Sequence, residues 1–140
     1  MNRLERILQV EDCPEDRMMT AEALSEVSPS IDLRSVANKE EAIAMISGNS
    51  EWRPSVVLVD ISLPGGSGFE VLQFMKTQPD LQIIPVIIFS SSKARQDIDK
   101  AYRLQANCYI AKPADFAGYL TVLTSMIKFC VGCVELPFPC

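Results

Sequence analysis

Residues 56–66 read VVLVDISLPGG, in which four aliphatic residues lead directly into Asp60 and then into a turn that contains Pro64. A short unbroken apolar run bounded by turn residues is typical of a strand buried on both faces of a parallel sheet. The carboxylate of Asp60 would then stand where the strand leaves the core, at the edge where open α/β sheets bind ligands. This stretch therefore predicts a fold class and the position of a functional site.

Four other segments have strand character, and helical patterns separate the five segments. The predicted strands are residues 7–10, 31–36, 56–59, 85–89 and 108–111. The second of these is less apolar than the others, so we expect it near an edge of the sheet. The predicted helices cover about residues 14–27, 38–47, 67–78, 93–105 and 115–129. Strands that alternate with helices imply a parallel sheet with both faces covered and right-handed crossovers.

Two helices carry more detailed expectations. Asn38, with Glu41 three residues later, predicts a capping box at the start of the second helix. Helical spacing of apolar residues predicts the face of the first helix that packs on the sheet, formed by Met18, Ala21, Leu24 and Val27.

The length and the net charge of the chain exclude several classes of protein. The chain has 140 residues, 48% of them hydrophobic, and a formal net charge of −5. This length suits one compact domain, predicted over residues 1–129, with residues 130–140 as a tail. The acidic balance argues against nucleic acid as a partner, since phosphate binding needs a basic face. No apolar run could span a bilayer, and the amino terminus lacks a signal-peptide core, so we expect a cytoplasmic location.

The histidine and cysteine content of the chain excludes several kinds of catalytic and metal site. The chain has no histidine, which excludes His-based triads and His metal sites within it. Its odd, irregular set of five cysteines indicates reduced thiols rather than a disulfide framework. Cys130 and Cys133 have the spacing of half a zinc or redox motif. Because no second pair and no histidine accompany them, we interpret them as ordinary residues near a helix end.

Polar side chains follow four of the five predicted strands: Glu11 and Asp12, Asp60, Ser90, and Lys112. Because the carboxyl ends of parallel strands share one edge, these side chains are expected in one crevice. Three carboxylates and one ammonium leave two net negative charges, which one Mg²⁺ would neutralise. The chemistry that fits is phosphoryl transfer to Asp60, because carboxylates form aspartyl phosphates. The metal and Lys112 would offset the developing charge while Ser90 donates a hydrogen bond.

These motifs resemble the receiver domains of bacterial two-component response regulators. The matching stretches are VED at 10–12, the strand into Asp60, Leu63-Pro64 with Gly68, IPVIIFS at 84–90 and YIAKP at 109–113. The resemblance runs from about Ile7 to Phe129 and is closest to the single-domain, chemotaxis-regulator-like type with no output domain. Residues 107–110 are also similar to small regulators paired with phytochrome-type histidine kinases. The resemblance implies a flavodoxin-like α/β fold, with a five-stranded parallel sheet in the order 2-1-3-4-5 and helices on both faces.

The resemblance also implies how a phosphoryl group and Mg²⁺ would be held. Asp60 would be the phosphoacceptor. Mg²⁺ would be bound directly by Asp12, by Asp60 and by the backbone carbonyl of Ser62. Glu11 would hold the metal through a water molecule.

The remaining roles concern the response to phosphorylation. By resemblance, Lys112 and Ser90 would contact the phosphoryl group, and the bond between Lys112 and Pro113 would be cis. Ser90 and Tyr109 would form the switch pair. The sequence departs from the family pattern at Ser90, where threonine is commoner, and at Ser67, where aspartate is usual. These departures leave the chemistry intact and bear on the rigidity of the switch.

The resemblance implies a signalling protein rather than an enzyme. Such a protein would catalyse only its own phosphorylation and dephosphorylation. It would accept a phosphoryl group from a sensor histidine kinase or phosphotransfer protein, and act on a downstream protein through a changed surface. It leaves open a homodimer through the face of the fourth helix, fifth strand and fifth helix. Neither nucleic acid nor a membrane is an expected partner.

Two alternatives start from the same carboxylates. A haloacid-dehalogenase-like phosphatase or phosphotransferase also has an aspartate after a strand, but it needs a second aspartate two positions later. Ser62 occupies that position, which counts against this alternative. A pseudo-receiver would bind partners without being phosphorylated, and the complete set of acidic residues counts against that.

Overall fold

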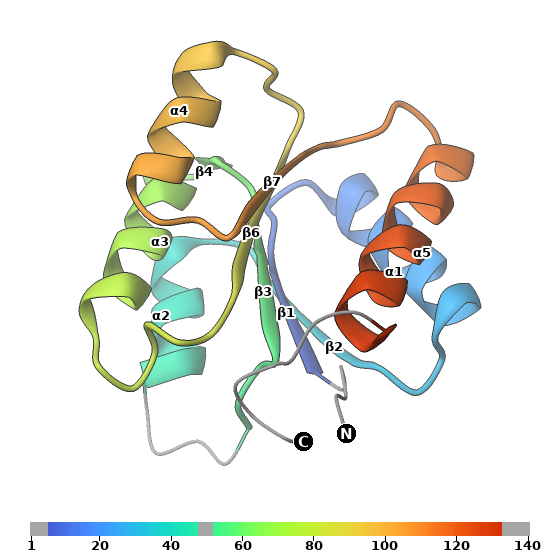
Figure 1. Ribbon diagram of the computed structural model, residues 1–140, viewed down its shortest axis with the longest axis horizontal. Coiled ribbons are helices and arrows are strands. Elements are labelled where there is room, and N and C mark those ends of the chain that lie inside the picture. The colour runs from blue at the N-terminus through green and yellow to red at the C-terminus, as the bar shows by residue number, and fades with distance from the viewer. Residues whose placement is uncertain (1–5, 48–51, 133–140) are drawn as a thin grey trace.

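A five-stranded parallel sheet forms the centre of the molecule, with the strand order β2-β1-β3-β6-β7 (Figure 1). The computed structural model describes residues 6–47 and 52–132. The strands of this sheet are β1 (Arg6–Val10), β2 (Asp32–Val36), β3 (Val56–Val59), β6 (Val86–Ser90) and β7 (Cys108–Ala111). Because β6 and β7 are its fourth and fifth strands, the predicted order 2-1-3-4-5 is confirmed, as is the edge position of the second strand.

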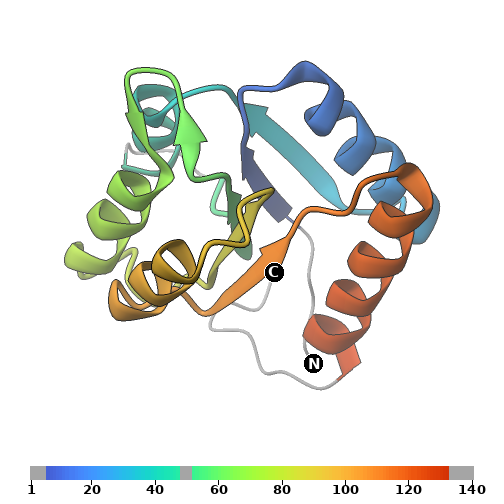
Figure 2. The same ribbon diagram turned by 90° about the horizontal axis from the view of Figure 1, so that it is seen from above.

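Helices cover both faces of the sheet. They are α1 (Pro14–Val27), α2 (Lys39–Ser47), α3 (Gly68–Thr77), α4 (Arg95–Arg103) and α5 (Phe116–Gly132). Figure 2, which looks from above, shows α1 and α5 on one face and α2, α3 and α4 on the other. Successive strand residues point to opposite faces and so form two apolar clusters. In β3, for example, Val57 packs with the α2–α4 layer and Leu58 with the α1–α5 layer.

The stretch that decides the fold behaves as its sequence predicts. All four residues of β3 are buried. The strand pairs with β1 on one side, where Val10 lies opposite Val59, and with β6 on the other, where Ile88 lies opposite Val59. A central strand covered by helices on both faces has no polar side, which explains its unbroken apolar run.

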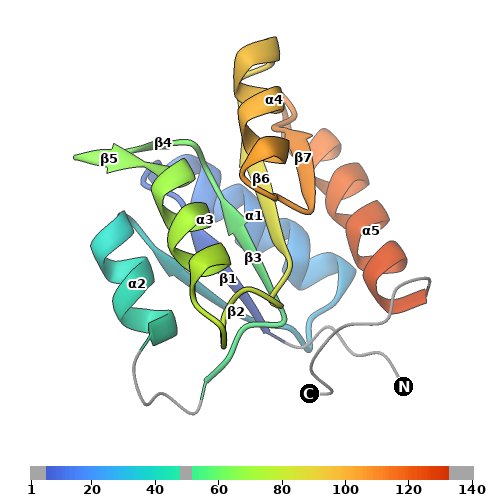
Figure 3. The same ribbon diagram turned by 60° about the vertical axis from the view of Figure 1, so that its left-hand side comes forward.

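The segment after Asp60 contains a small hairpin that the sequence analysis did not predict. β4 (Ser62–Leu63) and β5 (Gly66–Ser67) pair antiparallel and extend away from the sheet beside the start of α3 (Figure 3). Gly65 has φ +69° in the connecting turn, a left-handed conformation that favours glycine. Ser67 then caps α3, forming a capping box with Glu70. Ser67, which stands where the resemblance implies aspartate, is thus another good N-cap residue.

The predicted inward face of α1 is confirmed at Leu24 and Val27 and wrong at Met18 and Ala21. Its buried residues are Thr20, Ala23 and Leu24, whereas Met18 is 59% exposed and Ala21 is also exposed. The helix packs against α5 on the same face of the sheet. Ala23 and Leu24 belong to the same apolar cluster as Tyr119 and Leu123 of α5, so the packing of the two helices fixes which residues of α1 face inward.

The helix boundaries follow the predictions closely elsewhere. Asn38 Oδ1 accepts a hydrogen bond from the Glu41 N–H at 2.8 Å, as the capping box requires, although Glu41 reaches back to the N–H of Ala37. The last helix continues to Gly132, beyond the predicted end at Phe129, so the predicted tail overlaps it. Residues 133–140, including Cys133, lie outside the described residues. Within residues 6–47 and 52–132, no helix is long and apolar enough to cross a membrane.

Candidate functional site

The carboxyl ends of β1 and β3 bring three acidic residues together. Glu11 and Asp12 follow β1, and Asp60 follows β3, its immediate neighbour. Backbone pairing extends past the strands, because Asp60 N–H donates to the Val10 carbonyl at 3.0 Å and Glu11 N–H to the Val36 carbonyl at 2.9 Å. The sheet itself therefore fixes the starting points of these carboxylates.

The three carboxylates form a compact cluster. One oxygen from each of Glu11, Asp12 and Asp60 lies within 4.8 Å of the other two. Glu11 is 2% exposed and Asp60 7%, whereas Asp12 is exposed. The cluster thus has two buried carboxylates and one that opens to solvent. Hard oxygen donors beside water are what Mg²⁺ requires, since it keeps several waters when bound by protein.

Lys112, which follows β7, supplies the positive charge of the crevice. Its Nζ lies 2.5 Å from Glu11, 2.7 Å from Asp16 and 2.8 Å from Asp60, and its side chain is 6% exposed. Burial alone would lower the pKa of Lys112, but hydrogen bonds with Asp16, Asp60 and Glu11 outweigh it and raise the pKa above its usual range. The ammonium therefore stays charged at physiological pH.

Asp16 is a site residue that the sequence analysis missed. It lies in the first turn of α1, four residues after Asp12. Because Asp12 precedes the helix, helical spacing does not connect the two residues, and the role of Asp16 is visible only from its contact with Lys112.

Glu11 is a second titratable group whose pKa this arrangement changes strongly. Burial raises its pKa to about 7, with the charge of Asp60 adding to the rise and Lys112 opposing it. Its Oε2 accepts a hydrogen bond from the N–H of Cys13 at 3.2 Å. In the metal-free protein, this raised pKa contributes stability below the ordinary value of about 4.5, and that contribution is lost as the pH rises through about 7.

We expect the affinity for Mg²⁺ to rise with pH up to about 7 and then to level off, because Glu11 must lose its proton before it can assist a cation. Calorimetric titration of Mg²⁺ across this range measures the effect. Glu11→Gln removes the titrating group and should flatten the profile. A profile equally steep in both proteins would show that another group is responsible.

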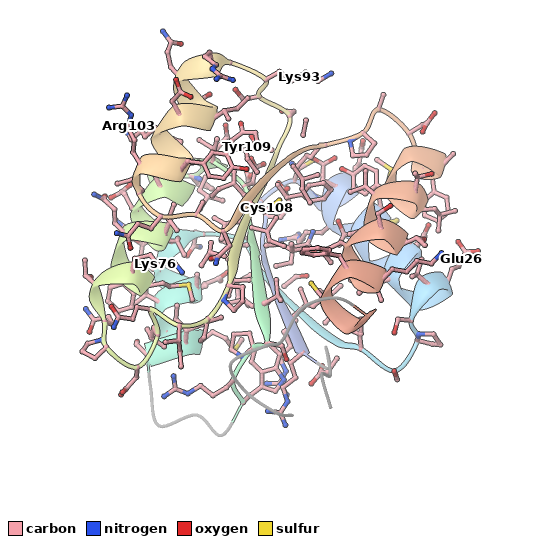
Figure 4. The ribbon with its side chains drawn as sticks, viewed as in Figure 1. Glu26, Lys76, Lys93, Arg103, Cys108 and Tyr109 are labelled. Carbon is pink, nitrogen blue, oxygen red and sulfur yellow. The ribbon has the colours of Figure 1, made fainter. Side chains whose placement is uncertain are left out.

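Ser90 and Tyr109 lie on neighbouring strands and contact the same loop residue. Ser90 ends β6 and is buried, and its Oγ accepts a hydrogen bond from the N–H of Ser92 at 3.3 Å. Tyr109 on β7 donates from its hydroxyl to the Ser92 carbonyl at 2.8 Å. Figure 4 shows Tyr109 on the α4 side of the sheet, where its ring packs on the apolar cluster of that face.

Two further predictions concern the backbone: the carbonyl of Ser62 as a metal ligand, and a cis bond before Pro113. Ser62 begins β4, and its N–H lies 3.4 Å from Asp60 Oδ1. The predicted cis bond between Lys112 and Pro113 was wrong, since this peptide bond is trans. Trans is the favoured form before proline, and the lysine reaches all three carboxylates with it.

The family model of the response regulator receiver domain matches residues 7–124. The chain belongs to this family. It is 30% identical over 135 residues to response regulator Rcp1 of Synechocystis sp., a match covering 94% of this chain and 92% of that protein. The receiver resemblance inferred from the motifs is therefore confirmed, and the haloacid-dehalogenase-like alternative is not supported.

Solved structures give the same result for the fold. The phosphorylated cyanobacterial phytochrome response regulator RcpA superposes with a TM-score of 0.90 at 31% identity, covering 97% of this chain and all of that one. The Mn²⁺-bound form of Rcp1 gives a TM-score of 0.86 at 30% identity, covering 96% and 99% of the two chains. The flavodoxin-like receiver fold is thus shared with regulators of phytochrome signalling.

Proposed function

We propose that this receiver signals through phosphorylation of Asp60, assisted by a divalent cation. The observation that carries the proposal is the convergence of Glu11, Asp12 and Asp60 within 4.8 Å, with the Lys112 ammonium 2.8 Å from Asp60. An isolated group of three carboxylates would resist ionisation. A divalent cation and the Lys112 ammonium would offset the negative charge of the three carboxylates, so that Asp60 can accept a phosphoryl group.

In the proposed reaction, a carboxylate oxygen of Asp60 forms a bond to phosphorus as the bond from phosphorus to the donor breaks. The donor leaves with the bonding electron pair, and the product is a mixed anhydride. Lys112 offsets negative charge on the phosphoryl oxygens, and Ser90 donates a hydrogen bond to one of them. Bound Mg²⁺ would neutralise further charge there.

The residues present fit a hard divalent cation. Asp12, Asp60 and the backbone carbonyl of Ser62 would bind it directly, and Glu11 would hold it through water. Their donor atoms are all oxygens, which favours Mg²⁺ over softer metals. The related Rcp1 has a Mn²⁺-bound form, which supports a divalent ion in this cluster.

The donor we propose is a sensor histidine kinase or a phosphotransfer protein in the cytoplasm. Similarity to Rcp1 and RcpA supports a phytochrome-type kinase as one such donor. The output is proposed to be a change in binding to a downstream protein, or in self-association through the face formed by α4, β7 and α5. Such a protein catalyses only its own phosphorylation and dephosphorylation.

A small phosphodonor tests this function without the natural kinase. We expect acetyl phosphate with Mg²⁺ to add the mass of one phosphoryl group to the intact protein, and EDTA to prevent it. Intact-mass spectrometry measures the fraction converted. A protein that stays unmodified while a known receiver reacts in the same buffer would contradict the proposal.

We propose that Ser90 transmits the phosphorylation of Asp60 to the face formed by α4, β7 and α5. Its hydroxyl would turn toward the phosphoryl group and release the N–H of Ser92, whose carbonyl holds Tyr109. This biases an existing equilibrium between two packings. We expect Ser90→Ala to be phosphorylated yet to respond weakly to beryllofluoride when self-association is followed by light scattering. The exposed neighbour Ser91→Ala should respond like the parent, and equal responses from both variants would exclude Ser90 as the coupling residue.

A further inference from the structure

Three carboxylates from three different elements share the ammonium of Lys112. Glu11 follows β1, Asp60 follows β3, and Asp16 lies in the first turn of α1. Their oxygens lie 2.5, 2.8 and 2.7 Å from Nζ, respectively. An ammonium has three N–H groups, so each carboxylate can take one of them.

Asp16 differs from the other two partners in one respect. Glu11 and Asp60 also belong to the cluster that could hold a metal ion, together with Asp12, whereas Asp16 does not. It is 27% exposed and reaches Lys112 from the helix side of the crevice. Among the described residues, it is the one ion-pair partner of Lys112 outside that cluster.

A divalent cation in the cluster would compete with Lys112 for the same counter-charges. The two positive groups repel each other, and the repulsion is strong in a partly buried crevice. Glu11 and Asp60 would direct oxygens to the cation, which weakens their hold on the ammonium. Lysine has a flexible stem of four carbons, so an ammonium released in this way would move toward solvent.

We propose that Asp16 is a positioning residue, which keeps the Lys112 ammonium beside Asp60 while a divalent cation is bound. This inference rests on the proposed function, because it concerns the same acceptor site. α1 begins at Pro14, two residues after Asp12, so the first helical turn places the backbone of Asp16 close to the cluster. Asp16 thus lets two positive groups act on one phosphoryl group at the same time.

The simpler role for Asp16 would be to stabilise the amino end of α1, where acidic side chains are favourable. Glu15 occupies the same helical turn, is exposed, and serves as a matched control for that role. A helix-stabilising effect would be shared by the two residues. Positioning of Lys112 would belong to Asp16 alone.

The test measures phosphorylation rates with saturating Mg²⁺ and increasing acetyl phosphate. We expect Asp16→Asn to lower the rate at saturating donor by about tenfold, since displacing a positioned group by an ångström can cost on the order of a hundredfold. Asp16→Glu should recover part of the rate, and Glu15→Gln should match the parent. An Asp16→Asn rate equal to the parent's would overturn the inference.

A second pair of variants separates positioning from helix stability. In a Lys112→Met background, which keeps an unbranched apolar stem, Asp16→Asn should cause no further loss of rate. A tenfold loss that persists without the lysine would overturn the inference, because Asp16 would then act independently of it. If the parent itself is not phosphorylated, the proposed function fails as well. A parent that reacts beside an unaffected Asp16→Asn variant contradicts the positioning role alone.

Discussion

Asp60→Asn is expected to abolish phosphorylation of the protein by small phosphodonors. A carboxamide is close to a carboxylate in shape but lacks the anionic oxygen that forms the bond to phosphorus. Asp60 is 7% exposed and lies at the centre of the contacts described above, so no other carboxylate of the cluster can take its place in the same geometry. Intact-mass spectrometry after incubation with acetyl phosphate and Mg²⁺ measures the loss directly.

The matched control is Asp80→Asn, because Asp80 is exposed in the segment after α3, away from the acidic cluster. This variant should be phosphorylated as readily as the parent. Circular dichroism checks that both variants are folded. Phosphorylation of Asp60→Asn to the level of the control would mean that the acceptor is another residue.

Gly68→Ala is expected to destabilise the protein by about 3 kcal/mol, toward the upper end of the costs of overpacking. A Cβ at this position would lie 2.0 Å from the backbone oxygen of Asp60 and 2.8 Å from Cγ1 of Val59. Backbone atoms cannot give way as a side chain can, so the first turn of α3 must separate from β3. Urea unfolding followed by circular dichroism measures the change in the free energy of unfolding.

Gly66→Ala is the control for this experiment. Its Cβ would meet the end of the Glu70 side chain at 2.6 Å, and that flexible side chain can move aside at the cost of its capping hydrogen bond from the N–H of Ser67. We expect the free energy of unfolding of Gly66→Ala to change by less than about 1 kcal/mol.

Because Gly68 contacts the backbone of the acceptor, Gly68→Ala should also slow phosphorylation. Equal stability of the parent and Gly68→Ala would show that the close approach of α3 to Asp60 is not required.

The central strands and the acidic cluster could be predicted because their signals are local. A strand buried on both faces must be apolar throughout, so residues 56–59 stand out in the sequence. Polar residues directly after such strands must gather at one edge, so the sequence alone predicts that Glu11, Asp12, Asp60 and Lys112 lie together. The order of the strands came from the family resemblance, because periodicity alone does not determine it.

The orientation of α1 and the role of Asp16 were not predicted, because they depend on contacts between helices and strands that are distant in the sequence. The rotation of α1, which exposes Met18 and directs Asp16 to Lys112, follows from its packing on α5 and from the charge of the lysine. Two-residue strands such as β4 are too short to produce an alternating pattern. The peptide bond before Pro113 was inferred by analogy, and this chain has the ordinary trans form.

Locating the phosphoryl group in the unaltered protein tests the central claim most directly. Borohydride reduces an aspartyl phosphate to homoserine, and peptide mass spectrometry then identifies the position. After treatment with acetyl phosphate and Mg²⁺, we expect homoserine in place of Asp60, and none when EDTA is present. Homoserine at another acidic residue, or conversion that is independent of the divalent cation, would contradict the account.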